Sequence, residues 1–472
     1  MNNGRICVSV CADNADSFIE NIYLAAPNAD IIELRVDCLR PDQVSTMLER
    51  LSSVSEEKPF VLTFRSNRQG GRNTASFEER VAFWKKDREG IWAVDVEEDV
   101  LDASRHWPTR IVSFHDLKGT PDGLNAAFEQ LLSAHTDVVK LAVKANDVTD
   151  GIHVWKLLHL AKGQNKNKEI IPIAMGEAGK WTRVLALAHG AFMTYAAINA
   201  RQRTAEGQIN ADDLANIYRV KELDLETKVY GVIGNPVSAS LSPYFLNPAF
   251  IDAGLNSVFI PFFVKDLGGF MNRMVRAETR EVELNIHGLS VTMPHKQAIM
   301  KYLDEIDPTA AAIGAVNTVR IEDHKLIGYN TDAYGFIEPL RERYGSLSGK
   351  RLAVLGAGGA ARACVYSLKQ EQAVVTVFAR DGAKADLFAR EFGVGSSAMS
   401  GIRKSARDFN VIVNATPIGM DGVTADEYAL SPGDLEGVDF VYDIVTSREE
   451  TPLVQAAKAA RIPTIGGIDM LV

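Results

Sequence analysis

The second half of the chain places a lysine and an aspartate shortly before a glycine-rich turn. Lys296 ends GLSVTMPHK (residues 288–296), Asp332 ends GYNTD (328–332), and GAGGAARA follows (356–363). A charged acid and base beside a nicotinamide site is what carbonyl reduction needs, because the oxygen of the hydride acceptor must gain a proton as it becomes an alcohol. This half therefore predicts an oxidoreductase.

The first half holds a second candidate, a lysine on an otherwise apolar strand. Lys140 lies in DVVKLAV. Partial desolvation and the Arg35 and Arg65 cations disfavour its ammonium form, which leaves more free amine to attack a ketone and form a Schiff base. His115, on the adjacent inward position, is the candidate acid and base. The alternative is a lysine that reaches solvent or pairs with a carboxylate such as Glu33.

The elements that position Lys140 are predicted by eight apolar, β-branched runs. They begin near residues 6, 31, 60, 92, 110, 137, 170 and 191, and helix-length stretches separate them. This alternation predicts a (βα)8 barrel. Within each run, apolar residues alternate with polar ones, so the apolar set packs under the helices and the polar set points inward. Burying several charged side chains inside a barrel costs too much free energy for them to serve only as packing, so we expect them to form a functional site.

The glycine-rich turn lies between a predicted strand and a predicted helix in KRLAVLGAGGAARACVYSL. Gly356 permits the tight turn, Gly358 lets the backbone approach a pyrophosphate, and Ala361 takes the small-residue position where the helix packs on the strand. Arg380 stands about twenty residues further on, where an acid would hold an NAD ribose, and it favours the 2′-phosphate of NADP. Asp381, next to it, opposes that phosphate.

Composition and net charge limit the class of protein and the partners that we expect. The chain has 472 residues, is 46% hydrophobic and carries a net charge of −10, so we expect about three globular domains. The acidic balance argues against nucleic acid or an anionic membrane as a partner and leaves small anions as ligands. The four cysteines are scattered, which predicts free thiols in a reducing compartment. A strand predicted from Ile6 leaves no room for a targeting segment, so we expect the cytoplasm.

The motifs of the first half closely resemble type I 3-dehydroquinate dehydratase. They are ELRVD, TFRS, SFHD, VKLAV, MGEAGKWTR and RTAEGQI. The resemblance implies dehydration of 3-dehydroquinate through an iminium. It assigns the Schiff base to Lys140, acid and base work to His115, and substrate binding to Ser9, Glu33, Arg35, Arg65, Arg183, Thr204 and Gln208.

Two positions depart from the dehydratase pattern. The family has a carboxylate four residues after the arginine of TFRS, whereas this chain has Gln69. A neutral amide orients His115 but cannot stabilise its imidazolium, so we expect a weaker base. In the closing loop, Thr204 stands for the family's serine and Glu206 for its proline, which keeps the hydroxyl and changes only the rigidity of the loop.

The second half resembles shikimate dehydrogenase in GNPVSASLSP, GLSVTMPHK, GAVNT, GYNTD and NATPIGM. The resemblance implies NADP(H)-dependent reduction of 3-dehydroshikimate to shikimate. It assigns catalysis to Lys296 and Asp332, substrate binding to Ser240, Ser242, Thr292 and Asn317, and cofactor binding to Gly356, Gly358, Gly359, Ala360, Ala361, Arg380, Asn414 and Thr416. The family continues past the MLV of GGIDMLV with a glutamine that contacts substrate, and without it we expect weaker affinity.

The complete prediction is an α/β chain of three domains that carries two consecutive enzymes of the shikimate pathway. The barrel spans 1–222, a substrate-binding domain spans 228–334 and is completed by about 450–472, and a Rossmann domain spans 335–450. The predicted ligands are 3-dehydroquinate, 3-dehydroshikimate, shikimate and NADP(H). Two alternatives stay open: a Schiff-base aldolase barrel fused to a quinate or hydroxy-acid dehydrogenase, and a non-catalytic sensor of the quinate pathway.

Overall fold

The structure is a computed structural model that describes residues 4–54, 58–119, 123–163, 168–238, 240–420, 430–446 and 450–471. The chain forms two compact units, Met1–Gly288 and Leu289–Val472. Strand β12 (Ile286–Val291) contains the division between them. The predicted domain boundaries near residues 222–228 and 334–335 stay predictions.

The first unit contains a parallel sheet, which has a strand near each of the eight runs that the sequence predicted as strands. Its hydrogen-bonded order among the described residues is β7-β6-β5-β4-β3-β2-β1-β8-β9. Just before β8, the Phe192 N–H donates to the Ile170 carbonyl of β7 (2.9 Å), which joins the two ends of the eight-stranded run. The predicted (βα)8 fold is confirmed. The strands are β1 (Ile6–Val10), β2 (Ile31–Arg35), β3 (Phe60–Thr63), β4 (Ile91–Glu97), β5 (Arg110–Asp116), β6 (Val138–Lys144), β7 (Glu169–Met175), β8 (Thr194–Ala197) and β9 (Ile209–Asn210).

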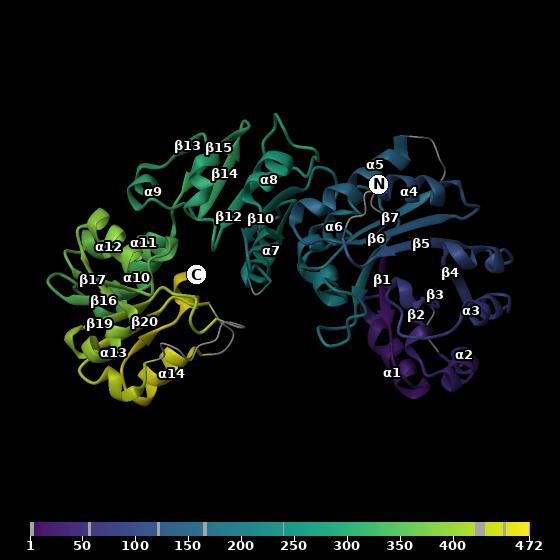
Figure 1. Ribbon diagram of the computed structural model, residues 1–472, viewed down its shortest axis with the longest axis horizontal. Coiled ribbons are helices and arrows are strands. Elements are labelled where there is room, and N and C mark those ends of the chain that lie inside the picture. The colour runs from purple at the N-terminus through teal and green to yellow at the C-terminus, as the bar shows by residue number, and fades with distance from the viewer. Residues whose placement is uncertain are drawn as a thin grey trace. The chain divides into compact units, whose positions relative to one another are not determined.

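Helices separate these strands and lie outside the sheet, as Figure 1 shows for α2 to α5. The side chain of Asn14 caps the helix Ala15–Ala25 by accepting a hydrogen bond from the Ser17 N–H (2.9 Å). The buried face of this helix includes Phe18 and Ile22. The helices of the barrel are α1 (Ala15–Ala25), α2 (Val44–Leu51), α3 (Phe77–Trp84), α4 (Leu124–Ser133), α5 (Gly151–Gly163) and α6 (Lys180–Leu185).

The barrel interior changes character along its axis. Side chains such as Val61, Ile111 and Val138 form an apolar layer toward the start of the strands. The polar side chains follow on the same inward rows, toward the ends of the strands, where parallel barrels carry their sites. The same unit also contains the parallel pair β10 (Lys228–Gly234) and β11 (Ser257–Phe263), with α7 (Ser242–Asp252) between them in sequence and α8 (Leu267–Phe270) after them.

The cysteine prediction is wrong for two of the four residues. Cys11 and Cys38 form a disulfide with their Cα atoms 5.5 Å apart, while Cys7 and Cys364 are free and buried. Cys11 directly follows β1, and Cys38 ends the short turn Val36–Cys38 that follows β2, so the ends of these two paired strands bring the two residues together. Their separation of 27 residues concealed this proximity.

The second unit begins with a small layer and ends with a doubly wound sheet. The small layer pairs β14 (Thr318–Glu322) antiparallel with β15 (Lys325–Tyr329), and β13 (Glu305–Ile306) runs parallel to β15. It is accompanied by α9 (Pro308–Ile313), and α10 (Asp332–Tyr344) leads to the larger sheet.

The larger sheet has the order β18-β17-β16-β19-β20-β21, with parallel pairings throughout. Numbered from β16, this order is the 3-2-1-4-5-6 order of a dinucleotide-binding fold, as predicted. Its elements are β16 (Arg351–Leu355), α11 (Gly359–Gln370), β17 (Val374–Ala379), α12 (Gly382–Phe392), β18 (Gly395–Ala398), α13 (Ile402–Ser405), β19 (Val411–Asn414), β20 (Phe440–Asp443), α14 (Pro452–Ala459), β21 (Thr464–Ile465) and α15 (Gly467–Leu471).

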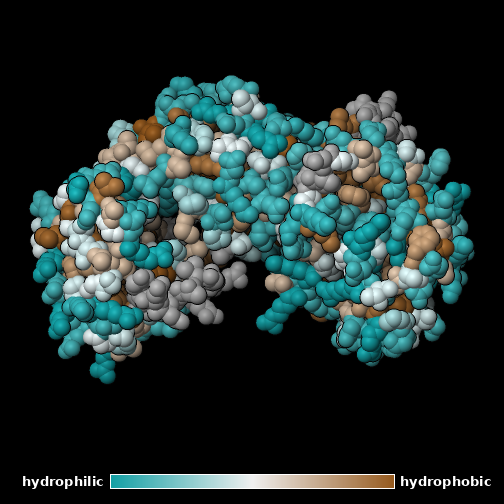
Figure 2. Space-filling view, in the orientation of Figure 1, coloured by the Kyte–Doolittle hydropathy of each residue, from teal (hydrophilic) through white to brown (hydrophobic). Residues whose placement is uncertain are grey.

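Alternation along the strands builds the two cores of this sheet. Leu352 and Val354 pack with α10, α11 and α12, whereas Ala353 and Leu355 pack with α13 and α14 (Figure 1). On the molecular face in Figure 2, hydrophobic residues appear as separate brown groups among hydrophilic ones. Among the described helices, none combines the length and the apolar composition needed to cross a bilayer.

Candidate active sites

The inward polar residues of the barrel line a single cavity of about 260 Å³. All the residues of the first half that the sequence predicted for the site contribute to its wall. These are Ser9, Glu33, Arg35, Arg65, His115, Lys140, Arg183, Thr204 and Gln208. The structure therefore brings together residues that are as much as 199 positions apart, from Ser9 to Gln208.

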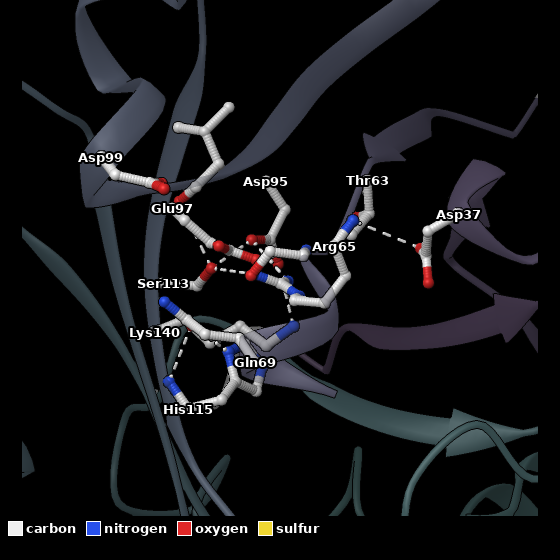
Figure 3. A network of polar contacts seen from close by, with 12 residues as sticks. Asp37, Thr63, Arg65, Gln69, Asp95, Glu97, Asp99, Ser113, His115 and Lys140 are labelled. Atoms are coloured by element: carbon white, nitrogen blue, oxygen red, sulfur yellow. Dashed lines mark hydrogen bonds and ion pairs between the residues drawn. The ribbon is translucent and has the colours of Figure 1, made fainter. Parts of the chain in front are cut away.

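Lys140 extends from the middle of β6 into this cavity and meets a carboxylate. Its Nζ lies 2.9 Å from an oxygen of Asp95 and 3.8 Å from an oxygen of Glu33. Asp95 also accepts hydrogen bonds from Arg65 (2.8 Å) and from the Ser113 hydroxyl (2.6 Å), as Figure 3 shows. Burial alone would raise the pKa of Asp95, but Arg65 and Lys140 outweigh it and hold that pKa below its ordinary value.

These pairings also show which charges surround Lys140. The sequence predicted that Arg35 and Arg65 would disfavour the ammonium. Each arginine is instead paired with its own carboxylate, Arg35 with Asp37 (2.7 Å) and Arg65 with Asp95. Asp95 therefore contacts both Arg65 and Lys140, which puts a carboxylate beside the amine that the sequence did not predict.

His115 lies at the end of β5, with Gln69 of the short turn 67–69 beside it. A single oxygen, Gln69 Oε1, lies 3.0 Å from the His115 backbone N–H and 3.1 Å from its Nδ1. An oxygen at this place requires the proton on Nδ1, so the Nε2 lone pair is free to accept a proton. Desolvation, Arg65 and Lys140 hold the pKa of His115 well below its ordinary value, so the ring is neutral.

Arg183 provides a cation for an anionic substrate. It is 2% exposed, and its Nε has no hydrogen-bond partner among the residues described. Its guanidinium donates to the Tyr195 carbonyl (3.3 Å), and burial lowers the pKa of Arg183 to about 10. A buried guanidinium with free donors is costly unless an anion pairs with it, which favours a carboxylate-binding position.

The remaining predicted residues form the floor and the loop of the cavity. The Ser9 hydroxyl donates to Glu33 (2.6 Å), and the Gln208 Oε1 accepts from the Thr204 N–H (2.8 Å). Glu206, at the family's proline position, pairs with Lys144 at 2.9 Å. The loop that carries Thr204 is thus attached to the end of β6.

Sequence reasoning missed three residues in and below this site, namely Asp95, Glu97 and Tyr195. The signal for the two acids was present, because they alternate with Val94 and Val96 on a strand with the same period as the one that carries Lys140. Glu97 accepts from the Ser66 N–H (2.7 Å) and lies 3.3 Å from Arg80. Tyr195 carried no signal, since an aromatic residue on a strand is ordinary core.

In the second unit, Lys296 and Asp332 form an ion pair despite their separation of 36 residues. Asp332 begins α10, and its other oxygen accepts a hydrogen bond from the Asn317 amide (2.8 Å). The side-chain oxygen of Asn317, Oδ1, in turn accepts a hydrogen bond from the Thr331 backbone N–H (2.9 Å). The lysine, aspartate and asparagine motifs therefore converge, and both charged side chains keep some exposure, 16% and 12%.

Three other residues predicted to bind substrate, Thr292, Ser240 and Ser242, take part in local hydrogen bonds of turns. Thr292 is half-buried in the turn before Lys296, and its carbonyl accepts from the His295 N–H (2.9 Å). Ser240 and Ser242 belong to the first unit, where the Ser240 hydroxyl accepts from the Ser242 N–H (3.3 Å). Their predicted role in carboxylate binding stays a prediction.

The glycine turn fits a dinucleotide. Gly356 has φ +114°, and a Cβ there would lie 2.7 Å from the Ala415 carbonyl oxygen, so a larger residue is excluded. Gly358 precedes α11 without any side-chain cap, and a Cβ there would meet nothing within 4 Å. This open space in front of free helix N–H groups suits a pyrophosphate. Ala360 lies in the same first turn, and Ala361 is fully buried under it.

At the predicted ribose end of the cofactor site, Arg380 is exposed and immediately follows β17. Asp381, predicted to repel a 2′-phosphate, is the N-cap of α12 and accepts from the Lys384 N–H (3.1 Å). Asn414 is 3% exposed and holds the next loop through Asp443 (2.9 Å) and the Thr416 hydroxyl (2.6 Å). The predicted cofactor contacts of Asn414 and Thr416 stay predictions.

Comparison with known proteins covers the whole chain. The family model of type I 3-dehydroquinase matches residues 6–224, the shikimate dehydrogenase substrate binding domain 232–319, and shikimate / quinate 5-dehydrogenase 338–468. A bifunctional 3-dehydroquinate dehydratase/shikimate dehydrogenase of Arabidopsis thaliana, described as chloroplastic, is 31% identical over 504 residues. That alignment covers 100% of this chain and 80% of the relative. The chain belongs to the bifunctional 3-dehydroquinate dehydratase/shikimate dehydrogenase family.

The second half has its own relatives outside the bifunctional family. A shikimate dehydrogenase (NADP+) of Methanocaldococcus jannaschii is 38% identical over 257 residues, which cover 53% of this chain and 89% of that protein. A crystal structure of a shikimate dehydrogenase in complex with NADP+ is 39% identical with a TM-score of 0.47, and it covers 53% of this chain and 88% of that one. Membership in the bifunctional family agrees with the resemblance that the motifs of both halves predicted.

Proposed function

We propose that the chain carries two consecutive activities of the shikimate pathway. The barrel dehydrates 3-dehydroquinate to 3-dehydroshikimate, and the second enzyme reduces this product to shikimate with NADPH. Similarity to a bifunctional relative over 100% of the chain supports both activities. One observation carries the barrel assignment: a buried arginine with free donors and a paired lysine line the same cavity, which suits a substrate with a carboxylate and a ketone.

In the barrel, Arg183 binds the substrate carboxylate and thereby directs the ketone toward Lys140. The ammonium gives its proton to the Asp95 carboxylate at 2.9 Å, the free amine adds to the ketone carbon, and the same proton later leaves with the ketone oxygen as water. Loss of water leaves a protonated iminium, which withdraws electrons from the neighbouring carbon. His115 Nε2 accepts the proton from that carbon and then returns a proton to the departing hydroxyl. The low pKa of His115 keeps it neutral and ready for the first transfer.

In the dehydrogenase, Lys296 and Asp332 lie where the reacting oxygen of the substrate must be protonated. The ion pair holds the ammonium in place, and Asn317 fixes the opposite oxygen of the aspartate at 2.8 Å. NADPH, when bound, supplies the hydride. Gly356, Gly358 and Gly359 would hold its pyrophosphate, and Arg380 would hold the 2′-phosphate.

Two single variants of the full chain separate the two activities. Lys140→Ala removes the attacking amine and abolishes dehydration of 3-dehydroquinate, while NADP+-dependent oxidation of shikimate continues. Lys296→Ala gives the reverse pattern. Borohydride with 3-dehydroquinate traps a covalent adduct on the wild type and none on Lys140→Ala, as intact mass shows. A wild type that forms no adduct excludes the dehydratase, and activity in neither half supports the sensor.

The covalent link between the enzymes raises the local concentration of the intermediate near the second site, without need of a tunnel. The cytoplasmic location predicted from the sequence stays a prediction, as does the absence of nucleic-acid and membrane partners.

A further inference from the structure

An aromatic ring covers the reacting amine of the barrel. Tyr195 lies on β8, and its ring centroid is 3.7 Å from the Nζ of Lys140. Both side chains are almost inaccessible to solvent, at 2% for Tyr195 and 4% for Lys140, and both line the same cavity. A cation over a desolvated ring face is attracted by the negative potential of that face.

We propose that the Tyr195 ring is a further catalytic group, which stabilises the positive charge on the Lys140 nitrogen before and after it binds substrate. The inference rests on the proposed dehydratase function. In that reaction an ammonium and a ketone give a protonated iminium and water, so the nitrogen changes from three protons to one. Two protons leave with the ketone oxygen as water, and one positive charge stays on nitrogen.

This balance explains why a ring suits the position. The Asp95 carboxylate holds the ammonium through a hydrogen bond (2.9 Å), and the number of N–H groups available for such bonds falls as the iminium forms. Attraction to a ring face depends on the charge and needs no N–H. It therefore persists through the covalent intermediate. Because the ring accepts no proton, it also leaves the proton transfers to His115 and the carboxylates.

The ring, and not the hydroxyl, is the functional part of Tyr195. Among the residues described, the Tyr195 hydroxyl makes no hydrogen bond to an oxygen or nitrogen atom. Across the β1–β8 pair, Tyr195 stands opposite Cys7, whose buried thiol is a weak hydrogen-bonding group. Loss of the hydroxyl should therefore cost little, whereas loss of the negative ring face should weaken the iminium.

The test compares four full-length proteins: wild type, Tyr195→Phe, Tyr195→Leu, and a chain with pentafluorophenylalanine at position 195. Fluorination keeps the shape of the phenylalanine ring but removes the negative potential of its face. The measurements are kcat and KM for dehydration of 3-dehydroquinate, the fraction of chain trapped by borohydride at saturating substrate, and the melting temperature. The shikimate dehydrogenase activity of each chain calibrates the amount of active protein.

We expect Tyr195→Phe to stay within about threefold of wild type, and the fluorinated chain to lose about tenfold or more in kcat with a smaller trapped fraction. Tyr195→Leu should lose at least as much. Equal kcat and trapping in the phenylalanine and pentafluorophenylalanine chains, at equal melting temperatures, would overturn the proposal, because a steric role depends on shape alone. A wild type without turnover or adduct would instead reject the dehydratase itself.

Discussion

The Cβ of Lys296 lies 2.7 Å from the point where a Cβ on Gly359 would stand. The lysine proposed to serve the substrate therefore packs directly on the first residue of the helix proposed to bind the cofactor. No other residue type fits at 359 without moving Lys296 or α11. This contact explains why the glycine turn has a third glycine beyond the two that the backbone path requires.

Gly359→Ala should displace Lys296 and lower kcat of shikimate oxidation about tenfold or more, since small misplacements of a reacting group are costly. The matched control is Gly358→Ala, whose added methyl meets no protein atom within 4 Å. Gly358→Ala should leave the unliganded fold unchanged and raise KM for NADP+. Steady-state kinetics with both substrates varied distinguishes the two effects, and identical kinetic defects in the two variants would contradict this packing argument.

Gln69→Glu should change the pH dependence of the dehydratase. A carboxylate beside Nδ1 favours the imidazolium and raises the pKa of His115, which is now held well below its ordinary value. The base works only when neutral, so the acid limb of kcat/KM should move to higher pH by about one unit or more. Gln69→Leu, which leaves the His115 backbone N–H and Nδ1 without an acceptor, should lower the rate without that shift. An unmoved limb in Gln69→Glu would exclude His115 as the titrating base.

Asp443 makes the second unit less stable as pH rises. Burial raises its pKa to about 6 from an ordinary value of 3.8, even though Thr451, Val445 and Asn414 donate to it. The folded state therefore binds more protons than the unfolded state between these values. The contribution to stability is complete below about pH 4 and is lost as pH rises through 6, by an amount on the order of 3 kcal/mol.

Asp443→Asn should remove most of this dependence. The measurement is the melting temperature of the unfolding transition that NADP+ raises, followed in the two proteins from about pH 4.5 to about pH 8, a range that brackets the shifted pKa of about 6. Parallel pH profiles would show that Asp443 does not carry the effect. Asp439→Asn, at the exposed start of β20, is the control for the loss of a charge near the same strand.

The Cys11–Cys38 disulfide should be detectable by thiol counting. Alkylation in denaturant without reductant should label two cysteines, Cys7 and Cys364, and prior reduction should expose all four. Cys38→Ser should lower the stability of the barrel by about 3 kcal/mol, the effect expected for cross-linking a loop of this size. Four labelled thiols without reductant, in protein purified without reducing agent, would contradict the bond.

Arg380→Ala should raise KM for NADPH about tenfold or more through loss of a charge-assisted contact, and it should leave KM for NADH unchanged. Arg390→Ala, an exposed arginine in the last turn of α12, is the matched control. The ratio of kcat/KM for the two cofactors is the measurement. Equal losses with both cofactors would exclude a 2′-phosphate contact.

The sequence by itself determined the fold class and most of the side chains that the structure gathers in the barrel cavity and around Lys296. Each predicted barrel strand formed, because β-branched runs bury best in a parallel sheet, and period-two alternation placed Lys140, His115 and Arg65 on the inner face. The glycine spacing likewise predicted the strand, turn and helix of the cofactor site. These features depend on local periodicity and backbone geometry, which neighbouring residues control.

Only the tertiary structure decided which charges meet. Asp95 joins Lys140 to Arg65, a contact that the sequence did not predict. The Tyr195 ring over Lys140, the Cys11–Cys38 bond and the Gly359 contact likewise depend on strands and turns that are distant in sequence. Electrostatics and packing depend on distances of a few ångströms between such segments, and residue spacing along the chain does not specify those distances.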